Sequence, residues 1–160
     1  MPAPVLHMLT PSPHVSPFDV NMALEAGFGA IVPYTRVTLA VVAGLAQDAM
    51  FSSQPDTGVR SGIFIGGRDV LLALDMLEAA RARLVPPYQV SLFADPAGAF
   101  TAAAATIARV EKALPACPLS DRTIAVIGAT GPVGFATALL LAEQGARARM
   151  IGHRRIERLA

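Results

Sequence analysis

Short apolar runs alternate with amphipathic stretches along almost the whole chain. The amphipathic stretches place apolar residues at helical spacing, as at Val70, Leu74 and Leu77. Strands that alternate with helices predict a parallel α/β sheet. The predicted strands are Val5–Leu9, Ala30–Pro33, Gly62–Ile65, Tyr88–Ala94, Thr123–Ile127 and Ala148–Ile151. The predicted helices are Pro17–Ala26, Thr38–Met50, Asp69–Leu84, Ala99–Leu114 and Val133–Gln144.

A change of composition divides the chain. The segment Pro115–Asp121 contains two prolines and a Ser-Asp pair, which is typical of a linker. We therefore expect two domains, at residues 1–117 and 118–160. The second holds two predicted strands, whereas a Rossmann domain needs about six. We expect either the front part of a longer protein or a domain completed by another chain.

Composition narrows the class of protein. Of 160 residues, 53% are hydrophobic and 16% are charged, and the net charge is +1. This charge gives no support to nucleic-acid binding, and no apolar run reaches the roughly 18 residues of a membrane span. The single cysteine, Cys117, is typical of a reducing compartment. We expect a cytoplasmic protein without nucleic-acid or membrane partners, and the apolar excess favours a homo-oligomer.

A glycine-rich loop joins the fifth predicted strand to the last predicted helix. This order is required of a dinucleotide-binding loop, in which backbone and helix N-terminal N–H groups approach a pyrophosphate. The spacing is G-x-x-G-x-x-G rather than G-x-G-x-x-G, and Ala129 stands where the usual first glycine of the tight turn would be. A plain strand-to-helix turn without a ligand is the alternative. The candidate cofactor-binding residues here are Gly128, Thr130, Gly131, Pro132, Val133 and Gly134.

A basic segment follows the last predicted strand. His153, Arg154 and Arg155 stand about where an acidic residue would bind the ribose 2′-hydroxyl of NAD. Guanidinium groups suit a 2′-phosphate instead. The segment therefore favours NADP over NAD as the cofactor, and a solvated basic loop is the alternative.

Three stretches in the first domain carry candidate site residues. Ser16 is a helix N-cap, so Asp19 is either a capping-box carboxylate or a carboxylate at the rim of a ligand site. Asp95 follows a strand, where α/β sheets bind ligands, or it closes an Asx turn. The pair Gly66-Gly67 also follows a strand, and a helix start capped near Asp69 explains it equally well.

The histidines are scattered along the sequence and do not have the spacing of metal ligands. His7 lies in the first predicted strand and is expected to be a packed core histidine. No His, Cys and carboxylate residues have the spacing of a metal site, so no metal is expected.

Five stretches together resemble a known family, the bacterial NAD(P)-dependent methylene-tetrahydromethanopterin dehydrogenases of one-carbon metabolism. They follow the family's order over essentially the whole chain. The stretches are His7-Met8-Leu9-Thr10-Pro11, Ser16-Pro17-Phe18-Asp19-Val20-Asn21-Met22-Ala23, Gly62-Ile63-Phe64-Ile65-Gly66-Gly67, Phe93-Ala94-Asp95-Pro96-Ala97-Gly98 and Thr130-Gly131-Pro132-Val133-Gly134.

The resemblance implies an N-terminal α/β pterin domain followed by the first βαβ unit of a Rossmann fold. It also implies hydride transfer from methylene-tetrahydromethanopterin to NADP+ or NAD+ in formaldehyde oxidation. Nitrogen lone pairs of the pterin carry the resulting cation, so nearby carboxylates favour the reaction. Asp19 and Asp95 are therefore the candidate catalytic residues. The candidate substrate-binding residues are Ser16, Phe18, Asn21, Gly66, Gly67 and Thr101.

Two other functions stay open at the level of sequence. A methylene-tetrahydrofolate dehydrogenase would differ mainly in the tail and ring methyl groups of its pterin. A non-catalytic pterin-binding or assembly subunit would fit the incomplete second domain. For that same reason we expect residues 1–160 alone to be inactive.

Overall fold

The computed structural model describes residues 3–52, 60–88, 90–114 and 118–152. They belong to two compact units, Met1–Asp95 and Pro96–Ala160. Each unit has its own parallel sheet and its own hydrophobic core.

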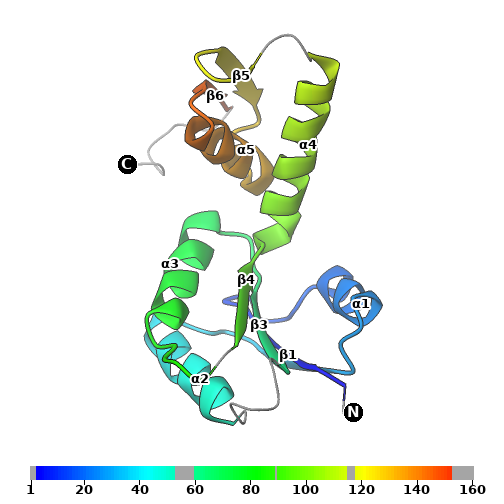
Figure 1. Cartoon of the computed structure of the whole chain (residues 1–160), viewed down its shortest axis with the longest axis vertical. Helices are drawn as coiled ribbons and strands as arrows, with labels where there is room; N and C mark the ends of the chain where they lie inside the picture. The colour runs from blue at the N-terminus through cyan, green and yellow to red at the C-terminus, as the bar shows by residue number, and fades with distance from the viewer. Residues whose placement is uncertain (1–2, 53–59, 89, 115–117, 153–160) are drawn as a thin grey trace. The chain divides into compact units, whose positions relative to one another are not determined.

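The first unit is a four-stranded parallel sheet in the order β2-β1-β3-β4 (Figure 1). From β1 the chain passes through α1 to β2 on one side, and from β3 it passes through α3 to β4 on the other. Right-handed connections in opposite directions place α1 on one face of the sheet and α2 and α3 on the other. The strands are β1 (Val5–Leu9), β2 (Ala30–Tyr34), β3 (Ser61–Ile65) and β4 (Ser91–Ala94), and the helices are α1 (Pro17–Glu25), α2 (Leu39–Phe51) and α3 (Val70–Arg81).

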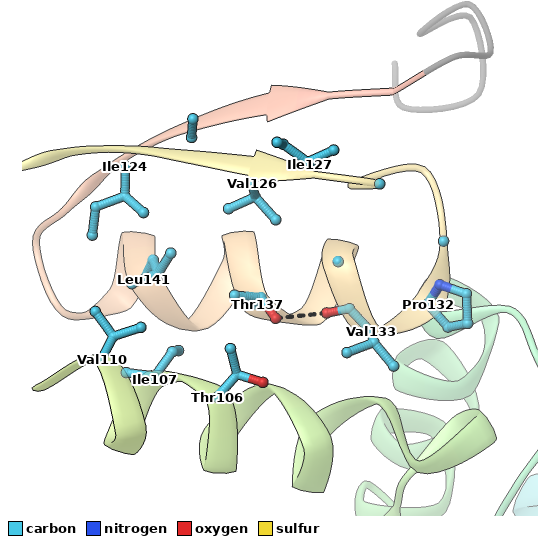
Figure 2. A pocket seen from close by; sticks show the side chains of 14 residues that line it. Thr106, Ile107, Val110, Ile124, Val126, Ile127, Pro132, Val133, Thr137 and Leu141 are labelled. Carbon is cyan, nitrogen blue, oxygen red and sulfur yellow. Dashed lines mark hydrogen bonds between the residues drawn. The ribbon is translucent and has the colours of Figure 1, made fainter. Parts of the chain in front are cut away.

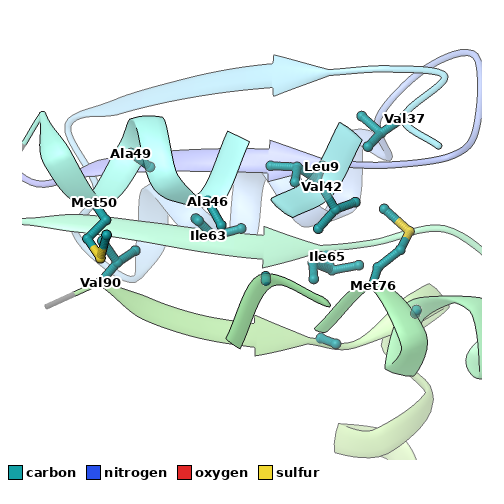
Figure 3. Close-up of a cluster of buried hydrophobic side chains, with 13 residues drawn as sticks. Leu9, Val37, Val42, Ala46, Ala49, Met50, Ile63, Ile65, Met76 and Val90 are labelled. Atoms are coloured by element: carbon teal, nitrogen blue, oxygen red, sulfur yellow. The ribbon is translucent and has the colours of Figure 1, made fainter. Parts of the chain in front are cut away.

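The main core of this unit lies between the sheet and the helices α2 and α3 (Figure 3). Side chains alternate along a strand, so Ile63 and Ile65 enter this core while Phe64 points to the α1 face. Met50 of α2 and Met76 of α3 are fully buried there. On the opposite face, α1 contributes buried Ala23 to a smaller cluster.

Two helix starts in this unit differ in their caps. Asp69 precedes α3, and its Oδ1 accepts a hydrogen bond from the Leu72 N–H at 3.0 Å. Ser16 precedes α1, but its side chain makes no cap hydrogen bond. The predicted cap near Asp69 is confirmed, whereas the predicted capping by the Ser16 side chain is wrong.

We therefore expect Asp69→Ala to lower the free energy of unfolding by about 1 kcal/mol. The matched change Ser16→Ala should alter it by less than about 0.5 kcal/mol. Urea unfolding followed by circular dichroism measures both values. Equal losses in the two variants would contradict this assignment of the caps.

The second unit is a Rossmann-like βαβ unit with one further helix packed against it. Strands β5 and β6 pair in parallel, and α5 connects them. Figure 2 shows α5 lying between β5 and α4. The elements are η2 (Pro96–Gly98), α4 (Ala99–Ala113), β5 (Thr123–Ile127), α5 (Pro132–Glu143) and β6 (Arg147–Ile151).

Helix α4 belongs to the compact second unit. Its Ile107 shares a buried core with Val126 of β5 and Leu141 of α5. The units therefore divide between Asp95 and Pro96, whereas the sequence places the boundary after Cys117. The difference arises because the helix before a proline-rich linker contributes its buried face to the unit that follows.

The predicted fold class is confirmed, since the described residues form parallel sheets with α/β connections. Most element ends lie within one residue of the prediction, and two differ from it by three residues. Strand β4 begins at Ser91 rather than Tyr88, because its first partner in β3 is Gly62. Helix α3 ends at Arg81 rather than Leu84, because the Arg83 and Leu84 N–H groups bond to carbonyls three residues back and two prolines follow.

Candidate functional site

The first candidate site lies at the carboxyl edge of the four-stranded sheet, where the strand connections reverse direction between β1 and β3. Three residues just beyond the strands stand in a row there: Thr10 after β1, Gly66 after β3 and Asp95 after β4. The Gly66 N–H donates to the Leu9 carbonyl at 2.9 Å, and the Asp95 N–H donates to the Ile65 carbonyl at 3.1 Å. Such a reversal point is where open α/β sheets bind ligands.

Thr10 and Asp95 are polar residues with only 4% and 5% of their surface exposed. The Thr10 N–H donates to the Tyr34 carbonyl at 2.9 Å, and the Thr10 Oγ1 accepts from the Ser12 N–H at 3.2 Å. No buried side-chain nitrogen or oxygen lacks a hydrogen-bond partner among the described residues. The edge is therefore an ordered polar surface.

Asp19 reaches this edge from α1. It lies four residues before buried Ala23, so both side chains are on the helix face toward the sheet. A Cβ on Gly66 would lie 3.5 Å from Asp19 Oδ2, which places the carboxylate directly over the glycine. Within the described part of the chain, neither hydrogen bond of a capping box with Ser16 is formed.

The electrostatics of the site raise the pKa of Asp19 above its ordinary value. Burial is the larger cause, and the negative charge of Asp95 is the second. Two carboxyl groups thus share a partly desolvated site. Such a site favours a ligand that is cationic or that offers N–H donors.

The raised pKa of Asp19 predicts how the free energy of unfolding changes with pH. Below the ordinary carboxyl pKa both the folded and the unfolded chain hold the proton, whereas at higher pH the folded chain carries a costly charge. The free energy of unfolding should therefore fall as pH rises through the interval between the ordinary pKa and the raised pKa of Asp19. Asp19→Asn should remove this fall.

Carboxyl NMR titration tests the cause directly. We expect Asp95→Asn to lower the pKa of Asp19 but not to return it to the ordinary value, because the effect of burial remains. An unchanged titration of Asp19 in this variant would show that the two carboxylates do not interact.

Two aromatic rings lie beside the carboxylates. Phe64 and Phe93 are neighbours on β3 and β4, with ring centroids 6.1 Å apart. A Cβ on Gly66 would lie 3.1 Å from Phe64 Cε1, and 52% of Phe93 is exposed. The site therefore has an apolar wall next to its acidic groups.

The structure requires glycine at Gly67 because the turn after β3 approaches the turn after β1 closely. Gly67 has φ 116°, a conformation that side chains rarely adopt. A Cβ there would lie 3.1 Å from Pro11 Cδ. The turn after β3 therefore packs closely on the turn after β1.

The structure does not bring every predicted residue to this edge. Ser16, Phe18 and Asn21 are exposed on or before α1, and no described contact joins them to the carboxylates. Asn21 is about 200° round the helix from Asp19. Thr101 lies in α4 of the second unit, where its hydroxyl donates to the Gly98 carbonyl at 3.3 Å.

His7 packs against Tyr34, with its Nδ1 3.2 Å from the Tyr34 hydroxyl, and burial lowers the His7 pKa. It is half-buried, however, and so is not the core histidine that the sequence predicts. Asp95 is followed by the short helix η2, in which Ala97 and Gly98 have φ of 56° and 66°.

The second candidate site is the glycine loop between β5 and α5. Gly128 has φ 79° and begins the turn. A Cβ on Gly134 would lie 2.5 Å from the Gly128 carbonyl oxygen and 2.8 Å from Ala129 Cα. This cradle admits no side chain at Gly134, as the close helix-to-strand packing of a dinucleotide-binding loop requires.

The loop also presents free donors. Pro132 occupies the first turn of α5 and Gly131 its N-cap, so a proline without an N–H costs nothing there. The N–H groups of Thr130, Val133 and Gly134 donate to no acceptor in the described part of the chain. With the helix dipole, these groups fit a pyrophosphate.

A cavity of about 530 Å³ runs along α5 from this loop (Figure 2). Its lining comes from α4, β5 and α5 and includes Ile107, Val126 and Leu141, and none of the described residues that line it is charged. Thr137 lines it as well, but its hydroxyl donates to the Val133 carbonyl at 2.8 Å. An apolar lining offers nothing to phosphates, so the loop is the candidate anion-binding end.

Some sequence predictions lie outside the described residues. These are His153, Arg154 and Arg155, together with Cys117. Within the described ranges no three His, Cys, Asp or Glu residues gather as metal ligands would. None of the helices in those ranges has the length and apolarity needed to cross a bilayer.

Sequence reasoning missed four residues of the first site, namely Thr10, Pro11, Phe64 and Phe93. Thr10 directly follows β1, as Asp95 directly follows β4. Its place at the end of a predicted strand could therefore have identified it as a candidate site residue. The aromatic pair depends on the register of β3 against β4, which the sequence does not contain.

The structure is a parallel α/β unit with one candidate site, followed by a Rossmann-like βαβ unit with a second candidate site at its glycine loop. A family model described as methylene-tetrahydromethanopterin dehydrogenase, N-terminal, matches residues 17–97, about half of the chain. The matched segment contains Asp19, Gly66 and Asp95 and ends near the boundary between the units. The chain belongs to this family, and the resemblance seen in the sequence is confirmed.

Two relatives come from Methylorubrum extorquens. One is an NAD(P)-dependent methylenetetrahydromethanopterin dehydrogenase, 48% identical over 159 residues, which are 98% of this chain and 54% of the relative. The other is the bifunctional protein MdtA, 32% identical over 98 residues, which are 61% of this chain and 34% of that relative. The chain thus spans about half the length of the first and a third of the second.

Proposed function

We propose that this chain supplies the pterin site and the first part of the nucleotide site of a methylene-tetrahydromethanopterin dehydrogenase. The reaction would transfer a hydride to NADP+, or to NAD+, in the oxidation of formaldehyde-derived one-carbon units. The observation that carries the proposal is the pair Asp19 and Asp95 beside Phe64 at the carboxyl edge of the sheet.

The residues at this edge suit a flat heterocycle with N–H groups. The rings of Phe64 and Phe93 offer apolar area to its face. Carboxylates accept hydrogen bonds only, so Asp19 and Asp95 match the amino and ring N–H groups of a pterin.

The same carboxylates favour the product. The C–H bond of the methylene bridge breaks, and its electron pair leaves with the hydrogen. The substrate becomes a cation shared by two nitrogens, without any proton transfer. A site of two nearby negative charges stabilises the positive charge as it develops. Orientation of the pterin by the aromatic wall adds to this effect.

The glycine loop fits the cofactor. The Gly134 cradle and the N–H groups of Thr130, Val133 and Gly134 would hold the pyrophosphate. When bound, the nicotinamide cofactor supplies the hydride acceptor. Preference for NADP over NAD rests on Arg154 and Arg155 in the sequence, whose guanidinium groups suit a 2′-phosphate.

Calorimetric titration with tetrahydromethanopterin under anaerobic conditions tests the pterin site. We expect binding with Kd between about 1 μM and 1 mM, weakened in Asp19→Asn and unchanged in Asp48→Asn, an exposed position on α2. Tighter binding of tetrahydrofolate would favour the folate enzyme. No binding of either pterin would overturn the proposal.

We further propose that the protein is a homo-oligomer of a reducing compartment. Its support is a single cysteine and the exposed apolar residues of α1, of which Phe18 is 65% and Leu24 is 53% exposed. Light scattering coupled to gel filtration measures the oligomeric state.

A further inference from the structure

Thr130 of the glycine loop lies directly against Gly152, the residue after β6. A Cβ placed on Gly152 would overlap the Thr130 Cγ2 methyl group and would lie 3.2 Å from Thr130 Oγ1. The Thr130 Cβ itself would lie 3.4 Å away. Gly152 therefore carries no side chain while Thr130 keeps its position.

The loop cannot slide away to relieve this contact. The N–H groups of Gly128 and Ala129 both donate to the Ile151 carbonyl, at 2.8 and 3.2 Å. The loop and the end of β6 are thus tied together one residue before Gly152. Only a turn of the Thr130 side chain would make room.

The end of the second strand is where a dinucleotide-binding fold selects its cofactor. An acidic residue there binds the ribose 2′-hydroxyl of NAD and repels the 2′-phosphate of NADP. Here the strand ends in apolar Ile151, and Gly152 follows. Among the described residues, this position carries the Thr130 hydroxyl and no carboxylate.

We infer that the contact between Thr130 and Gly152 keeps a carboxylate side chain out of position 152, so that the ribose subsite admits a nucleotide bearing a 2′-phosphate. This inference rests on the proposed function, because it specifies which nicotinamide dinucleotide the loop accepts. It makes Gly152 a specificity-determining residue, and Thr130 a positioning residue that excludes a side chain there. They act in addition to any basic side chain that follows them.

Binding of two half-cofactors to the chain tests this inference. The probes are adenosine 2′,5′-bisphosphate, which carries the extra phosphate, and 5′-AMP, which lacks it. In the double variant Thr130→Ala, Gly152→Asp, a carboxylate enters the subsite without a clash. We expect the bisphosphate to bind at least about tenfold more weakly, because like charges approach within a few ångströms. Binding of 5′-AMP should change little.

Controls separate charge from shape. Thr130→Ala alone should leave the ratio of the two affinities within about threefold of the parent. Gly152→Ala alone should weaken both nucleotides, because Thr130 must turn away, and adding Thr130→Ala should restore them. The comparison of Gly152→Ala with the double variant Thr130→Ala, Gly152→Ala still tests the inference if the aspartate variant does not fold.

The outcomes distinguish the two proposals. An unchanged affinity ratio in the double variant, or no restoration in the alanine pair, would overturn this inference and leave the dehydrogenase assignment intact. Failure of the parent chain to bind either nucleotide would overturn the cofactor assignment and this inference with it.

Discussion

Gly134→Ala is expected to abolish nucleotide binding and to destabilise the second unit. The new Cβ would lie 2.5 Å from the Gly128 carbonyl oxygen and 2.8 Å from Ala129 Cα. Both are backbone atoms, and Gly128 is fixed by its bond to Ile151, so the loop itself must shift. Overpacking of this kind costs about 1–3 kcal/mol, and we expect the melting temperature to fall by about 5 °C or more.

Gly131→Ala is the matched control in the same loop. Its Cβ would lie 3.4 Å from the Gly128 carbonyl oxygen, which is an ordinary contact, and its backbone is extended with φ −90°. The fold should survive this change with at most about 1 kcal/mol lost at the N-cap. Thermal unfolding and calorimetry with adenosine 2′,5′-bisphosphate measure both variants. A Gly134→Ala chain as stable as Gly131→Ala would contradict the close packing of the loop.

Asp19→Asn is expected to lower turnover by about tenfold or more, which corresponds to about 1.4 kcal/mol of lost transition-state stabilisation. Asparagine keeps the shape of the side chain but removes the charge that favours the product cation. Stability should not fall, because the raised pKa of Asp19 means that its charge is costly in the folded state. A capping role would give the opposite pattern, with stability lost and turnover retained.

Turnover is measured in a chimera that joins this chain to the part of the 48% identical relative that it does not match. Asp48→Asn in the same chimera is the control for a surface carboxylate. A normal rate in Asp19→Asn would remove this residue from the reaction. It would leave the pterin site to Asp95 and the aromatic pair.

Much of the fold could be predicted because local pattern and tertiary structure agree. Alternating apolar runs and glycine turns placed β1, β5 and the loop at Gly128 without any knowledge of the sheet. The spacing of Gly131 and Gly134 likewise follows from the backbone of one local turn. These features depend on neighbours in sequence.

What could not be predicted depends on partners distant in sequence. The position of the Asp19 carboxylate depends on the packing of Ala23 on the sheet, which points the carboxylate at Gly66 rather than at its own helix start. Phe64 and Phe93 meet only through strand register. The constraint on Gly152 comes from Thr130, across a whole βαβ unit.

The boundary between the two units also depends on contacts between residues distant in sequence. A proline-rich segment after α4 is a strong local signal for a linker. It does not reveal that Ile107 is buried against β5 and α5. Only the packing of that helix shows which unit it joins.

The most direct test of the central claim is hydride transfer by the chimera. Methylene-tetrahydromethanopterin and NADP+ are supplied together, and reduced nicotinamide and methenyl product are measured by absorbance. We predict that the two products appear in equal amounts and that NAD+ supports a slower reaction. No turnover, in a chimera that folds and binds adenosine 2′,5′-bisphosphate, would contradict the assignment of this chain to the dehydrogenase reaction.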